Sequence, residues 1–149
     1  MNIPRLSCFS STLSSLALAL VLATSPATAG ESSDRSVIGQ WRLALLLGFA
    51  DISALDENKA HRLTGKVLTI GATSMTLGKR RCGESTFHAE RVNRDEDLRD
   101  NAHVRDTTLG LPAKVKVIEL SCAYLYLKTR DSAVLAWEGA YFDVVRLKH

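Results

Sequence analysis

The last third of the chain, residues 114–147, alternates apolar and polar side chains in the way that consecutive β-strands do. Val115 and Val117 share one side of an extended chain, whereas from Ile118 onward the apolar residues occupy the other side. A change of one residue in this alternation indicates either a β-bulge or two strands joined tightly near residues 121–123. The sequence therefore predicts several strands here, with two alternatives for how the first of them are divided.

Two apolar runs close the chain. Residues 134–137 and 140–147 stand on either side of Glu138-Gly139. They indicate two strands paired across this dipeptide, or one long strand bent at the glycine. Tyr141 and Phe142 are neighbours on such a strand, so one of them must point away from the face that the other covers.

A further strand is expected over residues 39–49. Its large apolar side chains recur at every second position, at Trp41, Leu43, Leu45, Leu47 and Phe49. Such alternation is typical of a strand with one face on a core. A helix is the alternative, because Ile38, Trp41 and Leu45 fall roughly on one helical side, but Gly39 and Gly48 disfavour it. Shorter β-prone runs at residues 66–70 and 74–77 indicate a hairpin, and residues 86–92 indicate another strand.

Two helical segments are expected between the strands. Residues 53–65 begin with Ser53 as the candidate N-cap and end at Gly65, which suits the left-handed residue after a helix. Asp56 would lie in the first turn, where the helix dipole favours an acidic side chain. Residues 95–104 form a weaker, acidic segment.

About eight alternating strands, one or two short helices and no βαβ rhythm predict a mainly β domain of the α+β kind. We expect a small antiparallel β-barrel or a strongly curved sheet. Closure of this kind removes the exposed strand edges at which such sheets associate.

The first 29 residues are typical of a secretory signal peptide. Arg5 supplies a positive start, residues 16–23 are an apolar run, and residues 27–29 (Ala-Thr-Ala) offer the small side chains that a signal peptidase reads. The apolar run is far shorter than the ~20 residues that cross a bilayer. We therefore expect a periplasmic or secreted protein with no transmembrane segment in its mature chain. In the mature chain we expect residues 30–36 to form a flexible N-terminus and residues 37–149 to form a single domain.

Removal of the signal peptide leaves two cysteines, Cys82 and Cys122. In an exported protein an even number of cysteines indicates a disulfide. Closing a loop of about forty residues stabilises the fold by about 4 kcal/mol on the chain-entropy estimate. A metal site or a redox-active pair is less favoured, because neither cysteine has a second Cys or a His at the usual short spacing.

Charge and motifs argue against several classes of function. Loss of Arg5 from the 19 basic residues leaves 18 against 16 acidic ones, a mature net charge of +2. Nucleic-acid binding needs a clustered basic face, so we expect no nucleic-acid partner. The sequence has no nucleophile elbow, phosphate loop or zinc-protease motif. We therefore predict no enzymatic activity, no catalytic residue, no cofactor and no metal site.

The densest charge cluster is Lys79-Arg80-Arg81, next to Cys82. Three adjacent basic residues indicate a solvated turn. The functional alternative is a docking point for an anionic partner, either an acidic protein surface or anionic lipid head groups.

Gly39-Gln40-Trp41 resembles the G-x-W that opens the first strand of lipocalin-like barrels. In that family a basic residue late in the chain packs over the tryptophan, and Arg146 is the matching residue. A guanidinium over an indole ring is a favourable cation–π arrangement. With the C-terminal series Trp137-x-Gly139-x-x-Phe142-x-Val144-x-Arg146, the chain resembles a group of uncharacterised small exported bacterial lipocalin-like proteins. The resemblance implies a barrel held together at Gly39, Trp41 and Arg146, and implies no activity.

Two hypotheses of function follow. The first is an exported non-enzymatic binding protein that holds a small apolar or amphipathic ligand in its barrel, which requires a cavity of at least ~300 Å³. The second is a periplasmic protein-interaction module, such as an inhibitor or immunity factor against an exported enzyme. In that case residues 30–36 or the basic run would insert into the partner.

Overall fold

The computed structural model describes residues 32–100 and 109–148, so the predicted signal peptide lies outside the described residues. The strands are β1 (Ser32–Ser33), β2 (Gly39–Phe49), β3 (Val67–Ile70), β4 (Met75–Leu77), β5 (Arg80–Cys82), β6 (His88–Asn93), β7 (Lys114–Leu120), β8 (Ala123–Leu127), β9 (Ser132–Trp137) and β10 (Ala140–Arg146). The helices are the 3₁₀ turn η1 (Arg35–Val37), α1 (Glu57–Leu63) and α2 (Arg94–Asp100).

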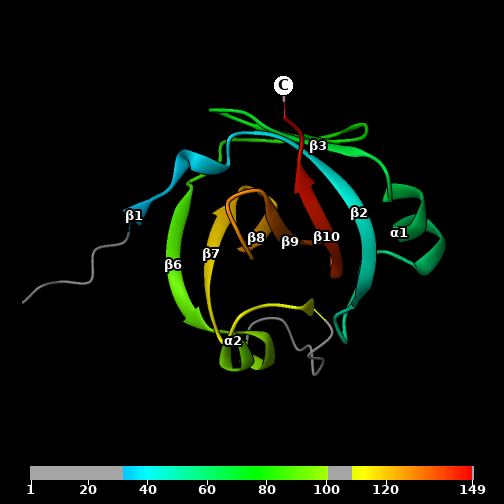
Figure 1. Cartoon of the computed structure of the whole chain (residues 1–149). Coiled ribbons are helices and arrows are strands. Elements are labelled where there is room, and N and C mark those ends of the chain that lie inside the picture. The colour runs from blue at the N-terminus through cyan, green and yellow to red at the C-terminus, as the bar shows by residue number, and fades with distance from the viewer. Residues whose placement is uncertain (1–31, 101–108, 149) are drawn as a thin grey trace, which may run out of the picture.

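The ten strands of the described residues form one antiparallel sheet in the order β1-β6-β7-β8-β9-β10-β2-β3-β4-β5. The sheet is strongly curled, so that β6 and β2 lie on opposite sides in Figure 1, with α2 below them and α1 outside β2. The predicted mainly β, strongly curved sheet with two short helices is therefore confirmed. Ten strands replace the expected eight or so, because β1 and β5 are too short to leave an alternation in the sequence. Among the described residues, no helix is long and apolar enough to span a membrane.

The strand β7 contains no bulge. It pairs with β8 in unbroken register from Lys116 opposite Leu127 to Leu120 opposite Ala123, and a two-residue turn joins the strands. Of the two alternatives, two strands joined tightly is the correct one. The apolar residues of β7 change from one side of the strand to the other because each face of the sheet is covered by a different buried cluster. Val117 packs into a small cluster with α2, and Leu120 packs into the main core.

The bulges lie in β2 instead. Its register with β10 shifts twice, so that Ala44 and Leu47 have no partner opposite them. Each bulge moves the alternation by one residue. Trp41 and Leu43 are consequently buried, but Leu45 is 58% exposed. The expectation of one continuous apolar face over residues 39–49 was wrong for the second half of the strand.

The sheet has two buried layers. The main core lies on the inner, concave face of the curled sheet and consists of large apolar side chains, including Trp41, Phe87 and Phe142. The second, smaller cluster lies on the other face of β7–β10 and contains Tyr126 and Tyr141 under α2. Tyr141 and Phe142 thus belong to different layers, as neighbours on a strand must.

The helix α1 begins later than expected. Asp56 is its N-cap and accepts a hydrogen bond from the backbone N–H of Lys59 at 2.8 Å. Ser53, the predicted cap, belongs to the preceding loop, where its hydroxyl lies 2.9 Å from the carbonyl of Leu55 and 3.2 Å from that of Glu138. The helix is therefore anchored to the β9–β10 turn through its leading loop.

The N-terminal segment contacts the sheet at its described residues, 32–36. Ser32 and Ser33 pair with β6, and Asp34 caps the η1 turn. The Nζ of Lys116 lies 2.6 Å from a carboxylate oxygen of Asp34 and binds this segment to β7. These contacts between Asp34 and strands far away in the sequence have no local sequence signal.

Two predicted long-range contacts lie where the sequence placed them. Cys82 at the end of β5 and Cys122 in the β7–β8 turn form a pair at disulfide distance, with Cα atoms 6.2 Å apart. Arg146 at the end of β10 lies over Trp41 near the start of β2. The cysteine pair joins parts of the curled sheet that are distant in strand order, whereas Arg146 and Trp41 are paired residues on the neighbouring strands β10 and β2.

Candidate functional site

The described part of the chain has at least two grooves that border the core. The first, which we call the tyrosine groove, has a volume of about 550 Å³. The second, the basic groove, has a volume of about 440 Å³. Large side chains such as Trp41 and Phe142 occupy the core itself, whereas these two grooves are open to solvent and could receive a ligand.

The floor of the tyrosine groove follows from the strand register. Glu119 of β7 lies opposite Tyr124 of β8, which lies opposite Ala136 of β9, which lies opposite Tyr141 of β10. Directly paired residues point to the same face of a sheet. The small side chain of Ala136 between two tyrosines leaves the hollow.

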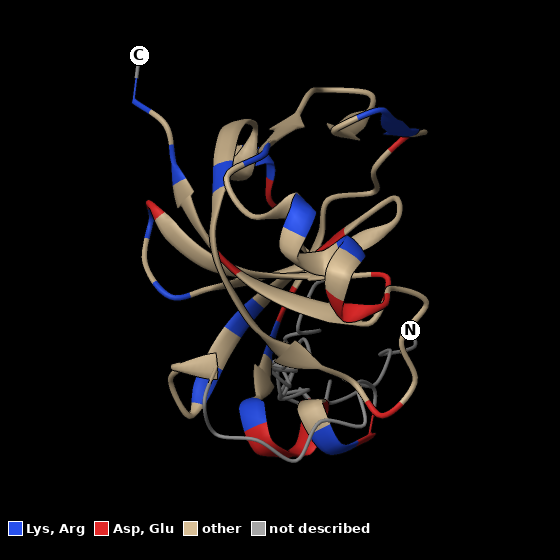
Figure 2. Ribbon diagram, turned by 90° about the vertical axis from the view of Figure 1, so that its right-hand side faces the viewer, with Lys and Arg blue, Asp and Glu red and all other residues tan. Residues whose placement is uncertain are grey.

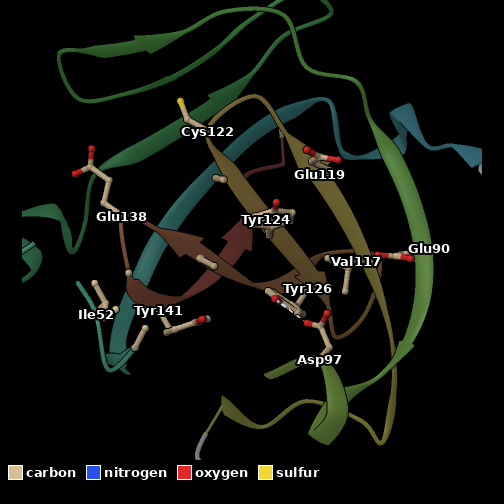
Figure 3. Close-up of a pocket in the computed structure, with 14 residues that line it drawn as sticks. Ile52, Glu90, Asp97, Val117, Glu119, Cys122, Tyr124, Tyr126, Glu138 and Tyr141 are labelled. Carbon is tan, nitrogen blue, oxygen red and sulfur yellow. Dashed lines mark hydrogen bonds between the residues drawn. The ribbon is translucent and has the colours of Figure 1, made fainter. Parts of the chain in front are cut away.

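A second row of residues runs parallel to the first. Glu90 of β6 lies opposite Val117, which lies opposite Tyr126. Figure 3 shows Glu90 and Glu119 at one side of the groove, Tyr124 and Tyr126 at its back, and Ile52 at the opposite side. All three tyrosines of the chain line this groove.

The lower end of the groove is closed by α2. Its Asp97 is only 8% exposed and accepts a hydrogen bond from the hydroxyl of Tyr126 at 3.0 Å. Burial raises the pKa of Tyr126, and the charge of Asp97 adds to this effect. Burial, assisted by the same carboxylate, raises the pKa of Tyr141 to about 12. Both phenols are therefore neutral at physiological pH and present uncharged, polar rings.

The lining of the tyrosine groove is acidic. Four carboxylates and no basic side chain are among its described lining residues. Glu138 is neutralised by an ion pair with Arg80, and Asp97 holds Tyr126. Glu90 and Glu119 form no ion pair with any described residue. This groove consequently favours a positively charged group, which aromatic faces also attract.

The basic groove lies between α1, the β4–β5 turn and the β9–β10 turn. Its apolar residues are Leu55, Leu63, Leu77 and Trp137. Its charged residues are Lys59, Arg62, Lys66, Lys79, Arg80 and Glu138. The composition is therefore amphipathic, with an excess of positive charge.

The predicted basic run contributes two of its three residues to this groove. The turn consists of Gly78 and Lys79, and β5 begins at Arg80, so Arg80 and Arg81 point to opposite faces. The guanidinium of Arg80 lies 5.8 Å from the ring centroid of Trp137 and forms the ion pair with Glu138. Arg81 does not line the groove. All three residues of the basic run are exposed, and two of them also line this groove.

Neither groove was predicted from the sequence as a single site. The basic groove combines the basic run with Lys59, Arg62 and Lys66, which the curled sheet brings close from other elements. Figure 2 shows basic and acidic residues dispersed over many elements, with both signs on α1, which faces the viewer. A signal for the tyrosine groove did exist, because Tyr124 and Tyr126 recur at alternate positions of one strand. The acidic partners of these tyrosines depend on register.

Comparisons with protein-family models, with curated proteins and with solved structures each gave no match. The geometry of the two grooves is therefore the basis for assigning function.

Proposed function

We propose that the protein is an exported, non-enzymatic binding protein that holds a small amphipathic cation in the tyrosine groove. The observation that carries this proposal is the combination of three tyrosines and two carboxylates without ion pairs around one hollow. Its volume of about 550 Å³ lies within the ~300–1,000 Å³ range of small-molecule sites.

The chemistry of the groove selects the class of ligand. Glu90 and Glu119 lie on one side and would attract an ammonium or guanidinium group. The ring of Tyr124, which is 49% exposed, offers a π face to the same cation. Val117 and Ile52 supply apolar surface on either side. A cationic head with a short hydrocarbon body satisfies all of these contacts.

This proposal moves the expected ligand from the interior of the barrel to the outer face of β7–β10. Large side chains fill the main core, and Trp41 at its centre has no exposed surface. Export is supported by the leader-like pattern of residues 1–29 and by the cysteine pair at disulfide distance. The lipocalin-like resemblance is supported by Arg146 over Trp41.

The alternative function, an inhibitor or immunity factor, has less support. It used either the basic run Lys79-Arg80-Arg81 or the segment at residues 30–36 as the element that inserts into a partner. Within that segment Ser32 and Ser33 pair with β6, and the carbonyl of Ser36 accepts a hydrogen bond from Arg146. An arm bound in this way is not free to enter a partner.

Titration with decyltrimethylammonium, below its micelle concentration, tests the proposal. Decyl glucoside has the same chain without the charge and serves as the ligand control. We expect saturable binding of the cation by calorimetry and backbone amide shifts centred on Tyr124 and Glu119. Replacing one partly exposed ionic contact changes affinity by up to about fivefold, and Glu119→Gln should weaken binding to this extent.

The variant Tyr124→Leu should weaken binding further, because it keeps apolar area but removes the π face. Glu84→Gln removes an exposed glutamate that does not line the groove and should leave the affinity unchanged. Equal binding of the neutral glucoside, or equal losses in the Glu84 and Glu119 variants, would overturn the proposal.

A further inference from the structure

We propose that the basic groove is a second, separate site, which takes one free amphiphile with a single alkyl chain and an anionic head group. The inference does not depend on the tyrosine groove, because the two sites attract ligands of opposite charge. Among the described lining residues, Glu138 is the one that the two grooves share. Its ion pair with Arg80 lies between them and separates them.

The floor of the groove suits a hydrocarbon chain. Trp137 and Leu77 belong to the main core and are 3% and 2% exposed, so they form the base of the groove and add little accessible area themselves. Leu55 and Leu63 are half-buried and face them from the α1 side. Burial of a methylene group is favourable by an amount proportional to the apolar area that it covers. An alkyl chain on this floor would extend the core outward.

The rim of the groove supplies the charge. Arg62, Lys66 and Lys79 line it from three different segments and form no ion pair with a described residue. Lys59 and Arg80 are already paired, with Asp56 at 3.1 Å and with Glu138 respectively. Three unneutralised cations around a mainly apolar floor repel a cationic amphiphile and attract a carboxylate or phosphate head.

Trp137 on the floor is a built-in reporter, and bromine quenches indole fluorescence at contact. We would titrate the protein with 10-bromodecanoate, using 10-bromodecanol as the uncharged analogue, both below the concentration at which they aggregate. We expect saturable quenching by the carboxylate and at least fivefold weaker quenching by the alcohol. The chain has only one other tryptophan, Trp41, so Trp137→Phe should abolish the quenching.

The basic run provides a matched pair of variants. Lys79→Gln removes a cation of the rim, and Arg81→Gln removes an adjacent cation that points away from the groove. We expect Lys79→Gln and Arg62→Gln each to weaken binding two- to fivefold, the range for a partly exposed ion pair. Arg81→Gln should leave it unchanged. Raising the salt from 20 to 300 mM should weaken binding in the wild type, because the Debye length shortens.

Any of the following three outcomes would overturn this inference. Quenching that is equal for the alcohol and the carboxylate would mean that no anion site exists. Equal losses in the Lys79 and Arg81 variants would mean attraction by overall charge. Binding only to vesicles with anionic lipid, and not to monomeric 10-bromodecanoate, would identify a membrane-docking surface instead. In Glu119→Gln, 10-bromodecanoate binding should be unaffected, so failure of the tyrosine-groove proposal is distinguishable from failure of this one.

Discussion

The guanidinium of Arg146 lies over the indole ring of Trp41, with its Cζ atom 4.4 Å from the ring centroid. Its two Nη groups donate to the carbonyls of Ser36 at 2.7 Å and Ile38 at 3.1 Å. A Cβ atom at Gly39 would lie 3.2 Å from Nη1, so the glycine leaves room for the guanidinium. One side chain thus fastens the end of β10 to the start of β2.

Arg146→Lys should destabilise the fold by about 1–2 kcal/mol. A lysine keeps the charge but loses the planar fork that stacks on the indole and bonds to two carbonyls at once. The midpoint of urea unfolding measures this effect. Arg130→Lys, at an exposed turn position, is the control and should leave the midpoint in place. Equal midpoints for the wild type and Arg146→Lys would show that the stacking contributes nothing.

Loss of the disulfide should have a larger effect. Cys82 is on β5 at one edge of the sheet, whereas Cys122 is in the β7–β8 turn. The bond closes a loop with a sequence separation of 40, for which the chain-entropy estimate is about 4 kcal/mol. The double variant Cys82→Ala/Cys122→Ala, or addition of a reductant to the wild type, should lower the melting temperature. A melting temperature that does not change on reduction would contradict the prediction.

Patterns that repeat along one element could be predicted from the sequence. The strand over residues 39–49 and the pairing of Cys82 with Cys122 depend on local alternation or on simple counting. The sequence left open whether residues 134–147 form a hairpin or one bent strand, and the pairing of β9 with β10 identifies the hairpin. The bulges at Ala44 and Leu47 could not be predicted, because a bulge is defined by the register with a partner strand. The short strand β1 is defined by its pairing with β6, more than 50 residues away in the sequence.

The candidate sites could be predicted only in part, for the same reason. The basic run identified Lys79 and Arg80, which line the basic groove. Its other cations come from α1 and from Lys66, just before β3, and only the curling of the sheet brings them together. The tyrosine groove depends on Ala136 lying between Tyr124 and Tyr141, a placement that the register of three strands determines.

The contact between Asp34 and Lys116 should make the protein sensitive to acid. Hydrogen bonds from Lys116 and Ser36 lower the pKa of Asp34 from 3.8 to about 2. A carboxyl group with a lowered folded-state pKa stabilises above its unfolded pKa, and this stabilisation is lost as pH falls from about 4 to about 2. Asp34→Asn should cost about 1–2 kcal/mol at pH 6 and almost nothing at pH 2. Glu96→Gln, an exposed change on α2, should show no such difference in urea unfolding at the two pH values.

Tyr126 and Tyr141 should make the fold sensitive to base. Their phenols have raised pKa values, Tyr141 to about 12. Above pH ~10 the unfolded chain releases phenolic protons that the folded chain retains, so stability falls as pH rises from about 10 toward 12.

Tyr126→Phe separates two effects of that phenol. At pH 7 it should cost about 1–3 kcal/mol, because the buried Asp97 loses a donor. Between pH 10 and 11.5, however, its stability should fall less steeply than that of the wild type. Unfolding by urea at pH 7 and 11 measures both effects. Tyr124→Phe, on a half-exposed side chain, is the control, with an expected change at pH 7 below about 0.5 kcal/mol. An unaltered alkaline slope in Tyr126→Phe would contradict the assignment.

Gly139 and Gly65 have the same backbone dihedral, φ +83°, but different surroundings. A Cβ atom at Gly65 would meet nothing within 4 Å, whereas at Gly139 it would lie 2.6 Å from the carbonyl oxygen of Ile52 and from the Cα of Ser53. Alanine at either position carries a left-handed backbone strain of about 1–2 kcal/mol. Gly139→Ala should cost at least about 1 kcal/mol more than Gly65→Ala, because the collision adds to the strain.

The same pair of variants tests whether the β9–β10 turn shapes the tyrosine groove. The backbone of the turn binds the loop before α1, since the N–H of Ala50 donates to the carbonyl of Gly139 at 2.8 Å. Gly139 and Ile52 both line the groove. Gly139→Ala should therefore displace Ile52 and weaken decyltrimethylammonium binding, while Gly65→Ala should leave it intact. Calorimetry at a temperature where both variants are folded separates the loss of shape from the loss of stability. Equal affinities would show that the groove does not depend on this contact.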